Sequence, residues 1–255
     1  ICPISPLILP DNSCNVIINS ARSGLGVLML PMALSGGTSS ATLAGTLVTH
    51  NAEVLSGIIL AQLTKKGVSC TYGSTSTILD LRFGTSAIGS PEYGMINASI
   101  AKLAQYYRLP SYVGGGASDS KIPDIQSGYE FTLSATLSAL AGGNIVFGSG
   151  VLEQGLTIDY ARLVMDAEMI RMIQVAIRDH SLQSMRSQSQ TKLFDRRSRD
   201  DWMEITKGMP MRERAYEAAI DIIQNHKPYP LPEGAPETMD EIVREFEKEL
   251  GIDKK

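Results

Sequence analysis

The sequence predicts an α/β fold of the (β/α)8 barrel type, to which this chain contributes about five βα units and a helical C-terminal appendage. Short apolar segments begin near residues 27, 69, 111 and 144, and another lies at the chain start. Each is followed by a break rich in glycine and serine and then by an amphipathic helix, with no antiparallel hairpin signal between them. Consecutive βα units of this kind form a parallel sheet.

A doubly wound open sheet and a closed barrel both accommodate such units. We favour the barrel because the glycine fingerprint of dinucleotide-binding folds is absent and because a polar segment follows every strand, as around the mouth of a barrel. Five units do not close a barrel of eight, so about three units would lie outside this chain. The opening residues, Ile1-Cys2-Pro3, also resemble the interior of a longer protein.

The first two units occupy residues 1–63. Residues 1–9 are predicted to form a strand that enters a loop, and residues 11–23 a helix that Gly24 ends. Residues 27–30 are a continuous apolar run, as expected of a strand that is covered on both faces. Ser39 or Ser40 then begins a helix to about residue 63, whose apolar side chains recur at helical spacing.

The third unit contains the longest connection. A strand over residues 68–72 is followed by a loop of about seventeen residues, where two to six is usual. Ser90 as the N-cap, Pro91 at the first helical position and Glu92 in the first turn predict a helix to about residue 107. A loop of this length in a regular α/β pattern is typical of a functional segment.

Two more units and an appendage complete the chain. The units have strands over 111–113 and 144–147 and helices over 124–140 and 159–181. From about residue 184 the composition changes: residues 186–201 are strongly charged, and amphipathic helices are predicted over 211–224 and 239–250. We therefore divide the chain into a barrel part, residues 1–183, and a charged helical appendage, residues 184–255.

The composition excludes several classes of protein. A net charge of −4 leaves no basic surface for nucleic acid. Polar residues interrupt every apolar run before the roughly eighteen residues that a membrane span requires. The cysteines, Cys2, Cys14 and Cys70, are few and far apart, which favours a reducing cytoplasm over a disulfide framework. Because no CxxC pair occurs and the three histidines are scattered, we predict no metal site in this chain.

In a parallel α/β architecture the functional site lies in the loops after the carboxyl ends of the strands. Here these loops are rich in glycine and hydroxyl groups and contain no histidine, which disfavours histidine-based acid–base chemistry. They favour a site that positions a substrate by shape, with one or two carboxylates. We predict catalytic roles for Tyr93, Asp119 and Glu153, and substrate binding by Tyr72, Ser74, Asp80, Arg82, Gly115 and Gly148.

Several of these candidates have a structural alternative. The run 114–116 (Gly-Gly-Gly) is either an anion-binding nest or a tight turn. Asp119 either faces a ligand or caps a turn, and Asp80 and Arg82 either belong to the site or form a surface ion pair. The side chains of Tyr72 and Tyr93 either point toward the barrel mouth or pack in the core.

Two further groups are expected to be structural. His50, Asn51 and Glu53 lie in the middle of a helix, where buried hydrogen bonding is the expected role. The methionines of the last barrel helix are expected to pack in the core: Met165, Met169, Met172 and Met185.

Several short motifs follow one another along the chain. They are NAEVL at 51–55 with Gly57, YGS at 72–74, GSPE at 89–92, SDSKIPD at 118–124 with GYE at 128–130, LE at 152–153 with GL at 155–156, and FDRR at 194–197 with Trp202. In these motifs and their order the chain resembles the trimethylamine methyltransferase family. The resemblance covers nearly the whole chain, as the C-terminal half or so of a family member.

The resemblance implies a (β/α)8 barrel that transfers a methyl group from a methylated amine to the cobalt of a separate corrinoid protein docked over the barrel mouth. The amine would be trimethylamine or a quaternary amine such as glycine betaine, and this chain would bind no cofactor tightly itself. Relatives that act on trimethylamine carry pyrrolysine in the active site; this sequence shows none, and we assign that position to Tyr93. We also expect a cytoplasmic homo-oligomer.

Methyl transfer requires a pocket that holds a cation until the methyl group leaves. Asp119, Glu153 and the ring of Tyr72 are suitable for this task. Two other hypotheses stay open at this point. The glycine runs also suit a barrel enzyme that binds a phosphate ligand, and the charged appendage suits a non-catalytic assembly surface.

Overall fold

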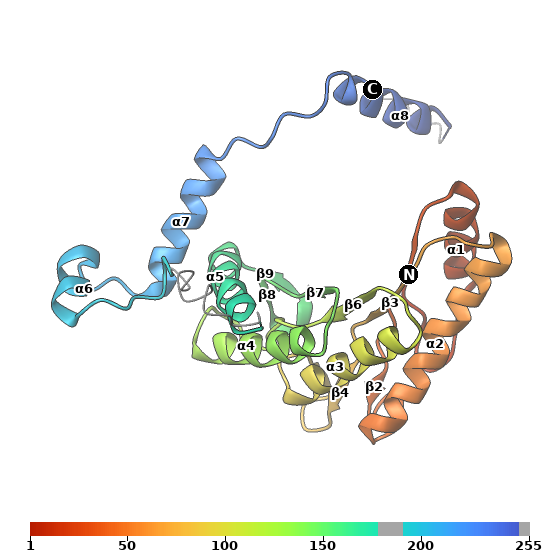
Figure 1. The fold of residues 1–255 in the computed structure, drawn as a ribbon, viewed down its shortest axis with the longest axis horizontal. Helices are drawn as coiled ribbons and strands as arrows, with labels where there is room; N and C mark the ends of the chain where they lie inside the picture. Colours follow the sequence, from red (N-terminus) through yellow and green to blue (C-terminus); the bar gives the residue numbers. More distant parts are fainter. Residues whose placement is uncertain (178–190, 250–255) are drawn as a thin grey trace, which may run out of the picture. The chain divides into compact units, whose positions relative to one another are not determined.

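The computed structural model describes residues 1–177 and 191–249. It divides into two compact units, Ile1–Ala219 and Ile220–Lys255. The predicted boundary after residue 183 lies outside the described residues. The first unit has the α/β architecture that the sequence predicts, and the second contains the end of α7 (Met211–Asn225) and α8 (Ala235–Glu249) (Figure 1).

Four parallel strands form the main sheet. They are β1 (Val27–Met29), β3 (Cys70–Ser74), β6 (Ser111–Gly114) and β7 (Ile145–Phe147), and their order in the sheet is their order in the chain. A doubly wound sheet reverses its strand order at a switch point, and these four strands show no such reversal. The sheet is open within the described residues. The backbone of Ile1 also bonds to Leu28 O at 2.7 Å and to Leu30 N at 2.8 Å, beside β1.

Five helices of the first unit lie along one side of this sheet (Figure 1). Each of the five packs against the next: α1 (Asp11–Ser23), α2 (Leu43–Thr64), α3 (Pro91–Tyr106), α4 (Ile125–Leu140) and α5 (Tyr160–Ile177). The predicted caps of two helices are confirmed, because Ser90 Oγ accepts from Tyr93 N, and Gly24 ends α1 at φ +79°. The helix predicted from Ser39 or Ser40 begins instead at Leu43, since Thr42 caps it.

The predicted first strand is wrong. Residues 2–9 contain only an isolated antiparallel bridge between Ile4 and Ile8. Pro3, Pro6 and Pro10 explain the difference, because proline has no N–H to donate to a sheet.

The expected absence of antiparallel hairpins is also wrong. The long loop after β3 folds as a hairpin of β4 (Thr77–Asp80) and β5 (Thr85–Ala87), with β2 (Leu34–Ser35) parallel to β4. A second hairpin follows β7, made of β8 (Val151–Leu152) and β9 (Thr157–Ile158). These strands have two to four residues, too few for an alternating pattern to be visible in the sequence.

Three apolar clusters form the core of the described residues, and the smallest contains Ile88, Tyr93 and Ala117. The first lies between the sheet and the helices α1, α2 and α3, where Ile17, Val54 and Ile100 are fully buried. The second joins α4 and α5 around Phe131. The core role predicted for Met165 and Met169 is confirmed, since they are 3% and 5% exposed; Met185 lies outside the described residues.

Helix α2 is long and apolar enough, by length and composition alone, to cross a membrane. It nevertheless buries the polar side chains of His50 and Glu53 against the α/β unit. A core helix meets the same length criterion, so α2 is explained by its place beside the sheet.

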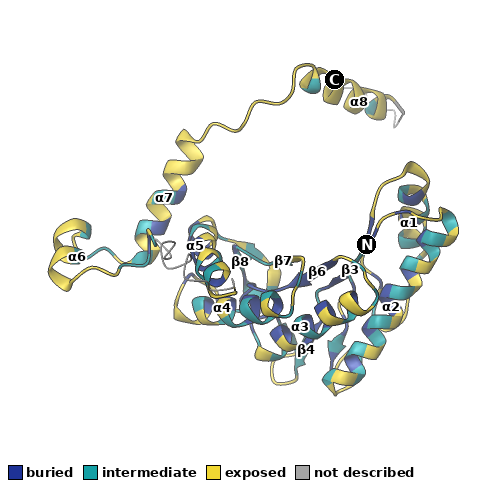
Figure 2. Cartoon of the chain, in the orientation of Figure 1, coloured by how far each residue is buried: buried dark blue, intermediate teal, exposed yellow. Residues whose placement is uncertain are grey.

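Residues 191–249 contain three helices joined by irregular segments and are more exposed than the α/β part of the chain (Figure 2). A helix that was not predicted, α6 (Arg199–Thr206), begins at the end of the charged segment, and Ser198 caps it. The two predicted amphipathic helices are present as α7 and α8. The first turns of α7 belong to the first unit, where Ala215 and Ala219 are buried. The apolar side chains of α8 are exposed: Met239, Ile242, Val243 and Phe246.

Candidate functional site

Four segments follow the carboxyl ends of the parallel strands: residues 31–37, 75–90, 115–121 and 148–155. We call them together the rim. Because the strands are parallel, these segments start from one edge of the sheet. Backbone hydrogen bonds join neighbouring segments, from Thr75 N to Pro31 O at 3.0 Å and from Ser118 N to Val151 O at 3.2 Å. The rim is therefore continuous along the sheet.

Asp119 and Glu153, two of the predicted catalytic residues, lie on adjacent rim segments. The amide of Glu153 donates to Ser120 O at 3.0 Å, and the amide of Gln154 donates to Ser118 O at 3.3 Å. These two bonds bracket Asp119 and hold the two segments together. Glu153 and Gln154 both have left-handed backbones, at φ +53° and +60°, a conformation that costs non-glycine residues about 1–3 kcal/mol each.

The carboxylate of Asp119 is partly buried. Burial raises its pKa above the ordinary value, while hydrogen bonds from the backbone of Gly89 and Ile88 offset part of this effect. The bond from Ile88 N to Oδ1 is 3.1 Å long and ties the segment 115–121 to the segment 75–90. Asp119 thus bonds to the preceding rim segment, a contact that differs from the turn cap given above as its structural alternative. Its predicted catalytic role stays a prediction.

Glu130, in the second turn of α4, binds the rim segment 115–121 through its carboxylate. Its Oε2 accepts from the Ser118 hydroxyl at 2.7 Å and from the Asp119 amide at 2.8 Å. The sequence reasoning used Glu130 only as part of a motif and did not assign it a role. A carboxylate one turn into a helix, just after a polar loop, is the signal that points to such a contact.

Tyr93 lies at the first turn of α3 and reaches over the end of β6. A Cβ added at Gly114 would lie 1.9 Å from its hydroxyl oxygen, so the side chain covers this glycine closely. It packs with Ile88 and Ala117 and is only 2% exposed. Burial raises its pKa, with contributions from Asp119 and Tyr112, so the hydroxyl stays protonated. This close enclosure leaves little space at position 93 for a side chain as long as pyrrolysine.

Asn97, one turn further along α3, is a residue that the sequence reasoning missed. Its Nδ2 donates to Tyr93 O at 2.9 Å and to Ser76 O at 3.2 Å, while its Oδ1 accepts from Gly114 N at 2.9 Å. Asn97 is fully buried and joins α3 to the rim segment 75–90 and to the end of β6. Its single polar side chain on a buried helix face was the available signal.

His50 and Glu53 have the buried hydrogen-bonding role that was predicted for them. The Nδ1 of His50 lies 3.1 Å from Ser76 Oγ, and burial lowers the pKa of this histidine to about 3. The imidazole is therefore neutral near pH 7. Glu53 accepts from Ser5 Oγ at 2.8 Å and from Leu7 N at 2.9 Å, which fastens the N-terminal loop to α2.

The side chains of Tyr72 and Ser74 are buried and are not exposed at the rim. The hydroxyl of Tyr72 donates to Asn51 Oδ1 at 2.7 Å, on the helix side of the sheet, and Tyr72 is fully buried. Ser74 Oγ accepts from Ser76 N at 3.0 Å and is buried as well. Tyr72 is thus placed in the core, the alternative given above.

The opposite face of the sheet carries an aromatic pair that the sequence reasoning missed. The rings of Tyr112 and Phe147 stack at a centroid distance of 4.5 Å, and both residues are half-buried. Because Tyr72 and Val113 face the helices and side chains alternate along a strand, Tyr112 faces away from them. Its proximity to the Tyr93 hydroxyl places this pair beside the rim.

Asp80 and Arg82 form an ion pair at the tip of the β4–β5 hairpin, with Arg82 Nη2 2.6 Å from Asp80 Oδ2. Arg82 is exposed, and its hydrogen bonds hold the pKa of Asp80 at about 2. This geometry corresponds to the surface ion pair given as an alternative. A role in substrate binding stays a prediction.

The glycines of the rim serve close packing. A Cβ at Gly115 would lie 2.7 Å from Val146 Cγ1, and one at Gly148 would lie 2.7 Å from Ala117 N. All three amides of residues 114–116 donate within the chain, to Asn97 Oδ1, Phe147 O and Ser134 Oγ. The run therefore has no free backbone N–H group for an anion.

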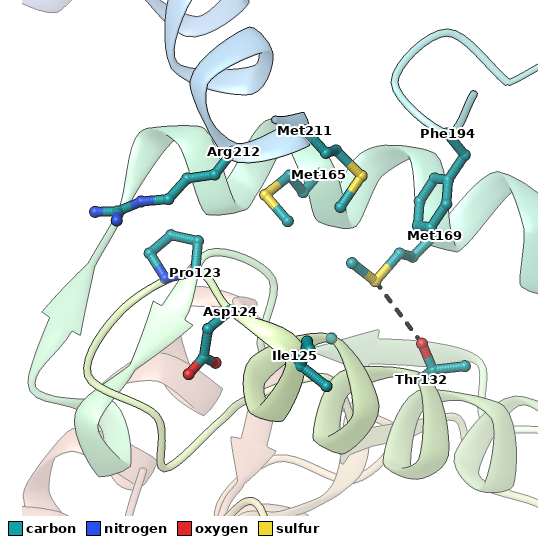
Figure 3. A pocket seen from close by; sticks show the side chains of 10 residues that line it. Pro123, Asp124, Ile125, Thr132, Met165, Met169, Phe194, Met211 and Arg212 are labelled. Atoms are coloured by element: carbon teal, nitrogen blue, oxygen red, sulfur yellow. Dashed lines mark hydrogen bonds between the residues drawn. The ribbon is translucent and has the colours of Figure 1, made fainter. Parts of the chain in front are cut away.

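A pocket of about 330 Å³ opens elsewhere in the first unit, between α4, α5, Phe194 and the start of α7 (Figure 3). Its lining is mainly apolar and includes Met165, Met169 and Met211, and none of the nine predicted site residues lines it. No group of three His, Cys, Asp or Glu side chains within the described part of the chain is arranged to hold a metal ion.

Comparison with known proteins identifies the family. Residues 1–186 match the family model described as trimethylamine methyltransferase (MTTB). The chain is 49% identical to trimethylamine methyltransferase MttB of Desulfitobacterium hafniense, over 99% of this chain and 56% of that protein. It is 44% identical to MttB of Methanosarcina thermophila, over 91% of this chain and 53% of the relative.

A more distant relative has a different name. The glycine betaine methyltransferase of Desulfitobacterium hafniense is 38% identical over 67% of this chain and 36% of that protein. The chain spans about half the length of the MttB relatives that it matches. From the extent of these matches, the chain belongs to the trimethylamine methyltransferase family.

Proposed function

We propose that the full-length protein is a corrinoid-dependent amine methyltransferase, built as a (β/α)8 barrel and located in the cytoplasm. It would move a methyl group from trimethylamine, or from a quaternary amine such as glycine betaine, to the cobalt of a separate corrinoid protein. Family membership over nearly the whole chain carries this proposal. Four parallel strands in chain order, with the helices on one side, favour the barrel.

The chemistry requires little from the protein beyond binding and orientation. The methyl carbon receives an electron pair from Co(I), and the C–N bond breaks with its pair remaining on nitrogen. A quaternary amine therefore leaves as a neutral tertiary amine, and trimethylamine, bound in its protonated form, leaves as neutral dimethylamine, while the cobalt of the partner accepts the methyl group as methyl-Co(III). No proton moves in this step, which agrees with a rim that contains no histidine.

The rim residues would bind the substrate cation and favour it over the neutral product. The carboxylates of Asp119 and Glu153 attract a positively charged substrate and lose this attraction once the methyl group has left, which favours product release. The stacked rings of Tyr112 and Phe147 offer aromatic faces to a methylated ammonium group, the role expected earlier of Tyr72. The protonated Tyr93 hydroxyl lies beside them and orients the bound group.

The phosphate-binding alternative loses its support. The amides of residues 114–116 are all engaged, and Gly150 N donates to Asp166 Oδ2 at 2.7 Å. A phosphate site in a glycine run needs free N–H groups.

The test is a single-turnover assay. The full-length protein, a Co(I) corrinoid protein and one amine are mixed, and methyl-Co(III) is followed by absorbance. We expect transfer from a tertiary or quaternary methylated amine, and a loss of about tenfold or more in Asp119→Asn or Glu153→Gln. Absence of transfer from every such amine would refute the proposal.

A further inference from the structure

A fully buried ion pair on α5 contacts the rim segment 148–155. Arg162 Nε bonds to Asp166 Oδ1, one helical turn away, and both side chains are 0% exposed. The Arg162 guanidinium also lies 5.4 Å from the centre of the Phe131 ring on α4. Removing two charges from water is costly, so a pair of this kind is a poor means of stabilising a helix.

The second oxygen of Asp166 indicates another use. Oδ2 accepts from Gly150 N at 2.7 Å, and Gly150 has a left-handed backbone, at φ +77°. Gly150 immediately precedes β8, which leads into Glu153 and Gln154. The ion pair thus contacts the base of the rim segment that carries the predicted catalytic carboxylate.

We propose that Asp166, oriented by Arg162, is a positioning residue that fixes the Gly150 turn and thereby holds Glu153 beside Asp119. Arg162 restrains Asp166 through Oδ1 and leaves Oδ2 directed at the Gly150 amide. The left-handed backbones of Glu153 and Gln154 follow this turn after only two residues, and their amide bonds to Ser120 O and Ser118 O require that the strand between them be held in place. The effect on catalysis rests on the proposed function, whereas the effect on the turn does not.

A second carboxylate on α5 provides a matched control. Glu168 is 4% exposed and accepts two backbone amides, from Leu193 at 2.7 Å and Phe194 at 3.1 Å. It therefore makes the same type of contact from the same helix, but to a segment outside the rim. Loss of a buried acceptor at either position should destabilise the chain to a similar extent.

The experiment compares two double variants of the full-length protein. Arg162→Met with Asp166→Asn removes both charges and keeps an oxygen for the Gly150 amide, whereas Arg162→Met with Asp166→Leu removes that oxygen. Neutral pairs of similar volume usually replace buried ion pairs without unfolding the protein. Hydrogen exchange is measured in peptides that cover residues 150–154 and, as a reference, residues 191–196.

We expect exchange over residues 150–154 to be about tenfold faster in the Leu variant than in the Asn variant, with the reference peptide unchanged. Glu168→Leu should accelerate only the reference peptide. In the methyl-transfer assay the Leu variant should lower the rate constant about tenfold relative to the Asn variant, with amine affinity nearly unchanged.

Equal exchange at residues 150–154 in the two double variants would overturn the proposal. So would a decrease in methyl transfer of the same size in Glu168→Leu, because the effect would then reflect general destabilisation. If the wild-type protein transfers no methyl group, the proposed function fails, and the exchange comparison still decides whether Asp166 holds the turn.

Discussion

The Oε2 atom of Glu130 accepts a hydrogen bond from the backbone amide of Asp119 at 2.8 Å. The same oxygen accepts from the Ser118 hydroxyl, so one carboxylate on α4 fixes the backbone on which a predicted catalytic residue lies. The side chain of Asp119 meanwhile bonds to Ile88 N on the neighbouring segment. Backbone and side chain of Asp119 are thus held by different elements, which limits its freedom in the rim.

Replacement of Glu130 should disturb this arrangement. Glu130→Ala removes the acceptor of the Ser118 hydroxyl and the Asp119 amide, and it should lower the free energy of unfolding by about 1–3 kcal/mol, together with the rate of methyl transfer. Urea unfolding and the single-turnover assay measure these effects. Gln126→Ala is the control, since Gln126 donates to the other oxygen of Glu130 from an exposed position. Equal decreases in stability and in methyl-transfer rate in both variants would show that the hydrogen bond from Asp119 to Glu130 is not required.

His50 should make the folded state sensitive to acid. Its folded-state pKa of about 3 lies below the ordinary value of 6.5, so between these values the unfolded chain binds more protons than the folded chain. The contribution of His50 to stability is therefore present above pH 6.5 and is lost as the pH falls toward 3. We expect the stability difference between wild type and His50→Gln to shrink from pH 7 to pH 5, measured by urea unfolding. A difference independent of pH would contradict the buried neutral state.

Asp119 should give amine binding a characteristic pH dependence. Because burial raises its pKa, the carboxylate becomes neutral at a higher pH than an ordinary aspartate. Affinity for a quaternary ammonium, whose charge does not titrate, should therefore weaken as the pH falls, and Asp119→Asn should abolish this dependence. Calorimetric titration from pH 7 to pH 4.5 measures it. Asp11→Asn, an exposed carboxylate on α1, should retain the wild-type profile.

The aromatic pair should contribute to recognition of the methylated ammonium group. Tyr112→Leu or Phe147→Leu should weaken amine binding by about 0.5–2 kcal/mol, because the cation loses an aromatic face. The same titration measures this loss at a single pH. Tyr106→Leu is a suitable control, since Tyr106 is 79% exposed on α3. Unchanged affinity in both variants of the pair would remove it from the proposed site.

Several features of the protein could be read from the sequence. Glycine and serine after each apolar segment predicted the four parallel strands, and Ser90 with Pro91 predicted the start of α3 to the residue. These signals are local, because a cap or a strand end depends on the residues next to it. The motifs around residues 51–55 and 118–124 predicted the family for the same reason, since each is a short stretch of fixed residues.

Only the tertiary structure decided which side of the sheet each residue faces. The sequence made Tyr72 a candidate because it ends a strand, yet its register beside Met29 turns it to the helices, while Tyr112 takes the open face. A shift of one residue reverses the face of a strand, and a four-residue strand contains too little pattern to set its own register. Glu130, Asp166 and Asn97 accept from backbone amides that lie 11, 16 and 17 residues away in the sequence. The packing of the helices on the sheet determines which amide each side chain meets.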